Sequence, residues 1–182
     1  MHLWQLGLVG GIFLVGGREC KILTGIDDHS RFIVVAAVLE KHSGVVVCAA
    51  FVAVMQRWGV PFEVLTDNGK QFTGKFARPL PVEVLFERTC REHGISARLT
   101  KRRSPTTTGK IERFHRTLRR ELLDEVGPFA SIEAAQLALD EWVHSYNTER
   151  PHQSLDMATP VTLLCTREDA APPRPCHYVP CG

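Results

Sequence analysis

Two carboxylates stand where the sequence could support phosphoryl-transfer chemistry. Asp67 follows the apolar run "FEVL" and precedes Asn68-Gly69, and Glu112 lies in the basic stretch "TTTGKIERFHRTLRRELL". Phosphoryl transfer often uses two Mg²⁺ ions about 3.5–4 Å apart, and hard cations of this kind bind oxygen ligands from several carboxylates. Asp67 and Glu112 are therefore candidate catalytic residues and metal ligands.

Each carboxylate also has an ordinary structural interpretation. An Asp before Asn-Gly is common in turns, because its side chain accepts hydrogen bonds from nearby backbone N–H groups. Glu112 and Arg116 are spaced i,i+4, and such a pair contributes about 0.2–0.5 kcal/mol to an exposed helix. The chemical interpretation requires that the fold bring the two acids to one place.

The charge distribution favours nucleic acid as a partner. The formal net charge is +2, but residues 91–120 hold ten Lys or Arg against two acids and so carry +8, while the other 152 residues sum to −6. A basic block attracts a polyanion, and arginines hold DNA phosphates. A solvated basic face is the alternative. The candidate DNA-binding residues are Lys101, Arg102, Arg103, Lys110, Arg113, His115, Arg116, Arg119 and Arg120.

The elements that must position these residues alternate in type along the chain. "LWQLGLVGGIFL", "KILTGI" and "FIVVAAVL" read as three strands with short connections, which predicts an antiparallel meander. A helix over 43–58 with Ser43 as N-cap, a strand over 62–66, a helix ending at Gly94 and the strand "ISARLT" follow. Two helices, about 108–126 and 131–148, complete a βββαβαβαα order. This order predicts an α/β fold with a mixed sheet, in which parallel strands join the meander and helices flank it.

Composition bounds the organisation of the chain. Its 182 residues, 44% of them hydrophobic, suit one domain, predicted over 1–164, followed by a flexible Pro- and Cys-containing tail over 165–182. No apolar run reaches the roughly 18–20 residues of a membrane span, so we expect a soluble intracellular protein without a membrane partner. The six scattered cysteines indicate reduced thiols. A zinc site at Cys165, Cys176, His177 and Cys181 is disfavoured because no CxxC pair occurs.

Four ordered blocks carry a family resemblance. "TGIDDHSRF", "VLTDNGKQFTGKF", "SPTTTGKIERFHRTLRREL" and "YNTERPHQSL…TP" resemble the catalytic core of insertion-sequence transposases in the retroviral-integrase superfamily, over nearly all of residues 3–164. The resemblance implies a ribonuclease-H-like fold, an Asp-Asp-Glu triad, Mg²⁺ or Mn²⁺, strand cutting and transfer on DNA, and a homo-oligomer assembled on DNA. It also implies a bacterial cytoplasmic protein, bound to the nucleoid through DNA. By motif, Asp67 is the second acid and Glu112 the third.

The resemblance fails at the first acid. The family pattern is W-Q-x-D, and here Trp4, Gln5 and Leu6 are followed by Gly7. Whether the chain is an enzyme is therefore left open, and we expect impaired catalysis and weakened or lost metal binding. The nearest spare acids, Asp27 and Asp28, belong to the block "IDDHSR", so rescue by either is disfavoured.

Two other departures concern length. The interval of 45 positions from Asp67 to Glu112 is long for the family, with the extra residues around "ARPLPVEVL", where insertions are tolerated. Only three residues precede Trp4, so the chain resembles a truncated or remnant reading frame.

Two alternatives to a transposase core stay open. One is a non-catalytic DNA-binding or subunit-association module derived from such a core. The other is a ribonuclease-H-like nuclease acting on RNA or hybrids, against which the terminal "YN…RPH…TP" block argues. Within that block Tyr146 is expected to pack, and Arg150 and His152 to serve structure rather than to contact DNA or a partner subunit.

Overall fold

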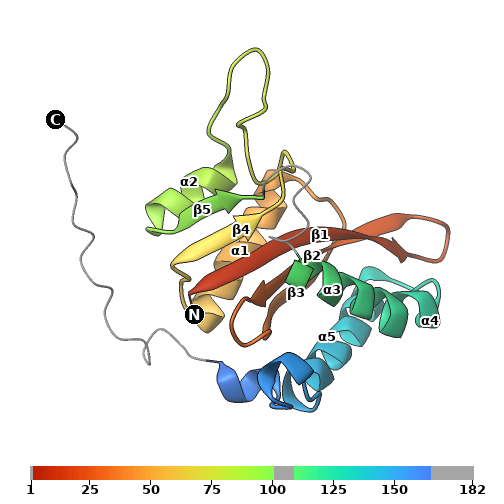
Figure 1. The fold of residues 1–182 in the computed structure, drawn as a ribbon. Helices are drawn as coiled ribbons and strands as arrows, with labels where there is room; N and C mark the ends of the chain where they lie inside the picture. Colours follow the sequence, from red (N-terminus) through yellow and green to blue (C-terminus); the bar gives the residue numbers. More distant parts are fainter. Residues whose placement is uncertain (1, 101–108, 165–182) are drawn as a thin grey trace.

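A five-stranded mixed sheet forms the centre of the molecule, in the order β3-β2-β1-β4-β5 (Figure 1). The structure is a computed structural model and describes residues 2–100 and 109–164. The strands are β1 (Leu3–Phe13), β2 (Glu19–Asp27), β3 (Ile33–Leu39), β4 (Glu63–Thr66) and β5 (Ser96–Leu99). The first three pair antiparallel, and β4 and β5 are added in parallel next to β1. The predicted sheet is confirmed.

The helices also follow the predicted order, with one difference. They are α1 (Gly44–Trp58), α2 (Leu85–Glu92), α3 (Gly109–Leu118), a π-helical segment (Arg119–Leu123), α4 (Asp124–Val126) and α5 (Ile132–Thr148), followed by 3₁₀ turns at Gln153–Leu155 and Pro160–Leu163. The single helix predicted over 108–126 is thus interrupted by five π-helical residues. Apolar spacing of 3.6 residues cannot reveal this wider turn, which buries the adjacent Leu122 and Leu123 together.

Serine side chains begin the two longest helices. Ser43 accepts a hydrogen bond from the backbone N–H of Val46 at 3.4 Å, and Ser131 accepts one from Ala134 at 3.2 Å. Each bond satisfies one of the N–H groups that have no partner in the first turn of a helix. The N-cap predicted at Ser43 is confirmed.

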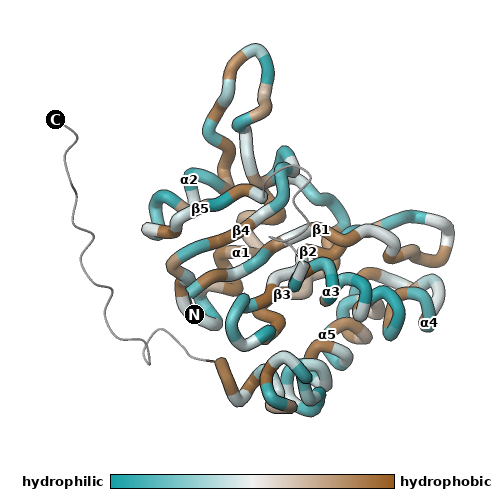
Figure 2. The backbone as a smooth tube through the Cα atoms, viewed as in Figure 1, coloured by the Kyte–Doolittle hydropathy of each residue, from teal (hydrophilic) through white to brown (hydrophobic). Residues whose placement is uncertain are grey.

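Two hydrophobic cores lie on the two faces of the sheet. Figure 2 shows hydrophobic residues (brown) along the strands between them. Neighbouring residues of β2 serve both: Leu23 packs in the core under α1 and α2, and Ile22 in the core under α3 and α5. Side chains of a strand point alternately to opposite faces, so a strand covered on both sides reads as a continuous apolar run. The central strands are therefore fixed by both cores.

A long loop between β4 and α2 projects from the sheet at the top of Figure 1. The residues predicted to be inserted, "ARPLPVEVL", lie in this loop and at the start of α2. Phe76, Leu80 and Val82 are exposed there, and the backbone N–H of Val82 donates to Gly74 O at 3.3 Å. The extra chain length thus leaves the sheet undisturbed.

Several predictions concern cysteines and chain segments. Cys20, Cys48 and Cys90 are buried free thiols, and burial raises the pKa of Cys90 to about 12. Residues 101–103 and the tail over 165–182, including its candidate zinc ligands, lie outside the described residues. In residues 2–100 and 109–164, none of the helices combines the length and the apolar character that crossing a bilayer requires.

Candidate active site

The three positions that the family pattern assigns to acids, Gly7, Asp67 and Glu112, line one cavity of about 180 Å³. It is lined by Gln5, Leu6, Gly7 and Leu8 of β1, by Leu65, Thr66 and Asp67 at the end of β4, by Thr100, and by Ile111, Glu112 and His115 of α3. The parallel register places Leu6 beside Thr66, so Gly7 and Asp67 are the next residues on adjacent strands. The structure thus brings Asp67 and Glu112 together at the carboxyl end of β4.

Asp67 is held by the turn that follows β4. Its Oδ1 accepts a hydrogen bond from the backbone N–H of Gly69 at 2.8 Å, and the side chain is exposed. The next residue, Asn68, donates from Nδ2 to Thr100 O at 3.1 Å and so ties the turn to the end of β5. Asp67 therefore both forms the turn and lines the cavity.

Glu112 is positioned through Gln5, which is buried on β1. Gln5 Oε1 accepts a hydrogen bond from the backbone N–H of Ile111 at 3.3 Å, in the first turn of α3, where the N–H groups have no partner within the helix. Gln5 Nε2 donates to Asp28 Oδ1 at 2.7 Å. Gln5 thus attaches the start of α3 to β1 and to the β2–β3 turn, a role that the sequence pattern did not reveal.

Gly7 is buried against the ring of His115. A Cβ atom built at Gly7 would lie 3.2 Å from His115 Cε1 and 3.4 Å from Ile111 Cδ1. These distances are tight, so any side chain at this position requires His115 to move by a few tenths of an ångström. The imidazole therefore takes up much of the space where the family pattern places the first acid.

His115 is engaged inside the molecule. Its Nε2 lies 2.7 Å from Thr24 Oγ1, and that hydroxyl donates to Gly7 O at 3.0 Å. Because a hydroxyl has one hydrogen, the His115 Nε2 must be the donor in the first contact. Burial lowers the pKa of His115 to about 4, with the Arg119 charge acting in the same direction and Glu112 opposing both. His115 is therefore neutral at pH 7, and its predicted contact with DNA stays a prediction.

The basic residues of α3 and the π segment differ in their partners. Lys110 Nζ contacts Asp28 Oδ2 at 2.6 Å, Arg119 Nη2 donates to Gly10 O at 2.9 Å, and Arg120 Nη2 contacts Glu121 Oε1 at 3.1 Å. Arg113 and Arg116 are exposed and form no ion pair with another residue in the described ranges. Among the predicted DNA-binding residues in the described ranges, these two are the best placed for a phosphate contact.

The spare acids of the β2–β3 turn do not reach the cavity. Asp27 is buried, and its Oδ2 accepts from the backbone N–H of Ser30 at 2.9 Å and from its hydroxyl at 2.8 Å. Asp28 binds Gln5 and Lys110. Within residues 2–100 and 109–164, no three His, Cys, Asp or Glu side chains form a group that could hold a metal ion. A substitute first acid is therefore missing from the described part of the site.

The final sequence block serves structure. Tyr146 is buried, with its ring centroid 5.2 Å from that of Trp142, as expected of a packing residue. Arg150 forms a bidentate pair with Glu121 of the π segment, at 2.5 Å and 2.9 Å. This pair lowers the pKa of Glu121 through the hydrogen bonds from Arg150. The structural role preferred for Arg150 is thus observed.

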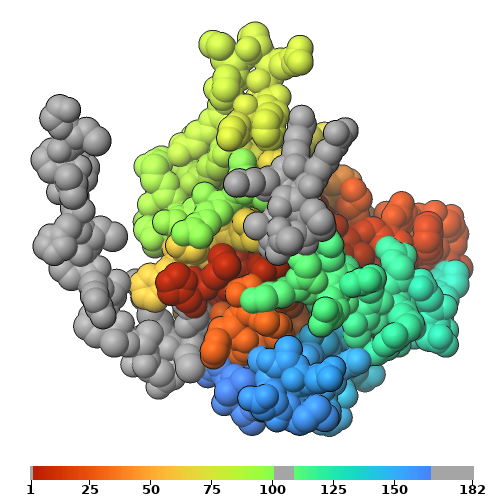
Figure 3. All heavy atoms as spheres, viewed as in Figure 1, coloured from red at the N-terminus to blue at the C-terminus, as the bar shows by residue number. Residues whose placement is uncertain are grey.

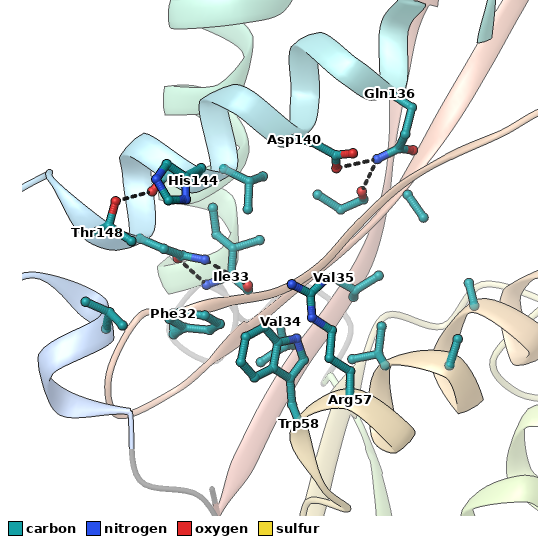
Figure 4. Close-up of a pocket in the computed structure, with 18 residues that line it drawn as sticks. Phe32, Ile33, Val34, Val35, Arg57, Trp58, Gln136, Asp140, His144 and Thr148 are labelled. Atoms are coloured by element: carbon teal, nitrogen blue, oxygen red, sulfur yellow. Dashed lines mark hydrogen bonds between the residues drawn. The ribbon is translucent and has the colours of Figure 1, made fainter. Parts of the chain in front are cut away.

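A larger cavity, of about 680 Å³, is a different feature (Figure 4). It lies between α1, β3 and α5, with Phe32, Trp58 and Arg57 on one side and Gln136 and His144 on the other. Asp140 supplies the single carboxylate of its lining. Its position away from β1, β4 and α3 separates it from the candidate active site.

The sheet, the flanking helices, and the site formed by Asp67 after β4 and Glu112 on α3 define an integrase-type, ribonuclease-H-like core. A solved structure of the HTLV-2 integrase catalytic core domain in complex with magnesium is similar, with a TM-score of 0.64 at 17% identity over 90% of this chain and 96% of that chain. An integrase core domain model matches residues 1–105, and a second integrase core domain model matches 93–160. The chain belongs to the integrase core domain family.

Proteins of insertion elements are similar in sequence. The 31.7 kDa protein of insertion element IS407 of Burkholderia multivorans is 29% identical over 87% of this chain and 53% of its own length. The 39.2 kDa protein of IS476 of Xanthomonas euvesicatoria is 33% identical over 81% of this chain and 40% of its own length. The chain thus spans about half the length of these relatives.

Proposed function

We propose that this chain is the core of an insertion-sequence transposase that binds DNA but is impaired in metal-dependent strand transfer. One observation carries the proposal: Gly7, Asp67 and Glu112 line a single cavity, and only two of these three residues carry a carboxylate. By the family pattern all three positions hold acids. The cavity therefore has the location of a phosphoryl-transfer site without its full set of ligands.

The residues present fit a pair of divalent ions poorly. Mg²⁺ and Mn²⁺ prefer oxygen ligands, and two-metal sites need several carboxylates to hold both ions. Asp67 and Glu112 are available to such ions, but Gly7 offers no side chain and Asp28 is committed to Gln5 and Lys110. We therefore expect weakened binding of Mg²⁺ or Mn²⁺.

The DNA partner is supported by the surface beside the cavity. Arg113 and Arg116 are exposed on α3 close to Glu112, and guanidinium groups bind phosphates through charge-assisted hydrogen bonds. The insertion-element relatives and the integrase core fold agree with this partner. As in the family, we expect the protein to assemble as a homo-oligomer on DNA.

One observation favours a second candidate, a non-catalytic module that binds DNA or another subunit. His115 fills the space beside Gly7 and is fixed by Thr24, so the site is packed in its present form rather than left with a gap. A packed site would retain the fold and the basic surface without catalysis. Metal-dependent strand cutting separates the two candidates.

The first prediction compares Gly7→Asp with Gly7→Ala in the full chain. The carboxylate of Gly7→Asp adds a third acid, so the melting temperature without metal should fall because the acids repel and His115 is displaced. With Mn²⁺ the variant should regain stability, by about 2.7 kcal/mol when the ion exceeds its Kd 100-fold. Melting curves with and without Mn²⁺ measure both effects.

Gly7→Ala is the matched control, because it presents the same Cβ to His115 without a carboxylate. It should lose stability without any gain in its response to Mn²⁺. Combining Gly7→Asp with His115→Ala removes the crowding and should keep the metal response. Equal Mn²⁺ shifts in Gly7→Asp and Gly7→Ala would show that position 7 does not face a metal site.

Activity provides the second measurement. Nicking of a supercoiled plasmid in Mn²⁺ should be weak or absent in the parent and should appear in Gly7→Asp. If the parent nicks the plasmid efficiently, and Glu112→Gln abolishes that nicking, the proposed impairment is wrong. If Gly7→Asp binds Mn²⁺ but still does not cut DNA, the non-catalytic module becomes the better description.

A further inference from the structure

We propose that a second cavity, on the opposite side of α3 from Asp67 and Glu112, binds a phosphodiester group of DNA. The proposal rests on the proposed function in its choice of DNA as the ligand. This basic cavity has a volume of about 500 Å³ and is lined by the β2–β3 turn, α3 and the segment that follows α5. Its main polar lining residues are Arg31, Lys110, Arg113, Thr117, Arg150 and His152.

The geometry of α3 separates the basic cavity from the candidate active site. Successive residues of an α-helix are rotated by about 100°. Lys110, Arg113 and Thr117 therefore share one side of α3 and line the basic cavity, whereas Ile111, Glu112 and His115 share the opposite side and line the other cavity. Figure 3 shows α3 (green) at the surface, above the blue segment that follows α5. One helix thus presents a carboxylate to one cavity and cations to the other.

Four cations line the basic cavity, and two of them have no acidic partner among the described residues. Lys110 is paired with Asp28, and Arg150 with Glu121. Arg31 makes one long contact, from Nη1 to His29 O at 3.4 Å, and Arg113 has no ion pair with any described residue. The lining includes no Asp or Glu. An anion would therefore meet two guanidinium groups without displacing an acid.

Neutral donors complete the lining. Burial lowers the pKa of His152, and the nearby charges of Arg150 and Arg31 lower it further, so all three favour the neutral imidazole. Burial raises the pKa of Tyr146 to about 12, although the charges of Arg150 and Arg31 act to lower it. The Tyr146 ring centroid is 4.8 Å from that of His152. Arg31, Arg150 and both rings line the same cavity. Hydroxyl groups of Thr117 and Ser154 also line it.

The backbone of Arg31 points to a role for its side chain. Arg31 has φ of 62°, in the left-handed region that residues with a Cβ rarely adopt, and its N–H closes the turn by donating to Asp27 O at 2.9 Å. Glycine would form this turn without strain. The turn therefore does not require arginine, and strained residues concentrate at functional sites. Binding of an anion by the guanidinium explains why arginine stands at position 31.

A DNA phosphodiester is the anion that fits this location. Guanidinium groups match phosphate oxygens with paired N–H donors. Arg113 belongs both to the basic cavity and to the exposed basic face of α3, so a strand bound to that face would continue into the cavity. A phosphate held there would fix the DNA relative to Glu112 on the other side of the helix. Arg31 is thus inferred to be a positioning residue for DNA.

The test measures binding of a fluorescent duplex oligonucleotide by the full chain at several salt concentrations. Arg31→Gln should weaken binding roughly tenfold and reduce the salt slope by about 0.9, as expected for one lost phosphate contact. Arg31→Lys should restore part of the affinity. The matched control is Arg57→Gln, which removes an exposed arginine from the cavity between α1, β3 and α5 and should change affinity less than twofold.

Arg31→Gly separates binding from folding, because glycine relieves the left-handed strain. Its melting temperature should not fall, while its DNA affinity should fall as in Arg31→Gln. Equal effects of Arg31→Gln and Arg57→Gln would overturn the proposal and leave the metal-based proposed function intact. If inorganic phosphate raises the melting temperature of the parent but not of Arg31→Gln, and DNA affinity is unchanged, the cavity takes a small anion instead. A parent that binds no DNA would overturn both DNA assignments.

Discussion

His115 illustrates how burial changes the chemistry of one side chain. It lies on the basic helix, yet its ring turns inward to Thr24, whose hydroxyl donates to Gly7 O. Desolvation of the charged form is the first cause of its low pKa, about 4. The residue therefore serves the packing of the cavity, and its charge state links the stability of the fold to pH.

The pH prediction follows from that link. The pKa of His115 is about 4 in the folded protein and near 6.5 in the unfolded chain, so the unfolded chain binds more protons between these values. The stability due to neutral His115 is fully present above about pH 6.5 and is lost as pH falls to about 4. The full effect is on the order of 3 kcal/mol. Urea unfolding at pH 7, 5.5 and 4.5 measures it.

The variant His115→Gln should reduce this dependence on pH, because an amide does not titrate. Other acid-sensitive groups, such as the Glu121 carboxylate held by Arg150, act equally in parent and variant and cancel in the difference. The exposed His42, changed to Gln in the same way, is the matched control. Parallel curves for the parent and His115→Gln would contradict the assignment.

At the scale of elements, α5 protects the edge strand β3. Asn147 is buried; its Oδ1 accepts from Ile33 N at 2.8 Å and its Nδ2 donates to Ile33 O at 3.1 Å. Gln136, about three turns earlier on α5, forms a similar pair of bonds. Its Oε1 accepts from Val38 N at 2.7 Å, and its Nε2 donates to Ala36 O at 2.9 Å. An uncovered edge would offer these groups to another strand. Side chains of α5 therefore take the place of a sixth strand.

Removing this protection should destabilise the domain. Asn147→Ala leaves the N–H and C=O of Ile33 buried without partners, which should cost about 2–3 kcal/mol. Gln136→Ala is the matched comparison: its site is partly exposed, so water can replace the lost bonds and the cost should be about 1 kcal/mol. Urea unfolding gives both values. An equal cost for the two variants would show that burial does not set the effect.

At the scale of the whole molecule, the packing of the two cores and the pairing of the basic residues are separate features. The sheet buries one core under α1 and α2 and another under α3 and α5, while the basic residues of 91–120 are divided between paired and unpaired positions. Arg91 pairs with Glu83, and Arg98 with Glu63. The local charge of +8 is therefore partly neutralised by acids from other parts of the chain. The proposed attraction for DNA therefore rests on fewer residues than the sequence suggests.

The double variant Arg113→Ala with Arg116→Ala tests this distribution. Each arginine that contacts a phosphate contributes about 0.9 to the slope of log K against log salt, so the slope should fall by about 1.8. The loss should be similar for unrelated DNA sequences, because phosphate contacts carry no base information. Binding of labelled duplexes at several salt concentrations measures it.

The control for that double variant is Arg18→Ala with Arg57→Ala, which removes the same charge from exposed positions outside residues 91–120. It should leave the slope close to that of the parent. If both double variants reduce the slope equally, the effect would come from net charge, and the basic face of α3 would lose its special role.

Local patterns in the sequence determined the elements and the family-matched positions. Strands covered on both faces read as continuous apolar runs, Ser43 marks a helix start, and Asp67 follows a strand directly. These features depend on neighbours in the chain, so spacing and residue type are sufficient to predict them. The glycine at position 7 was visible for the same reason, because it interrupts a short motif.

Only the tertiary structure decided what surrounds those positions. Gln5 contacts Ile111 across 106 residues, and Asn147 contacts Ile33 across 114, so no local pattern could indicate either bond. The inward ring of His115, the π-helical segment and the pairing of basic residues with distant acids likewise depend on how the elements pack. The basic cavity also exists only where the turn at Arg31, α3 and the segment after α5 meet. Contacts of this kind form through packing between elements, and packing is set by the shapes of both partners rather than by either sequence segment alone.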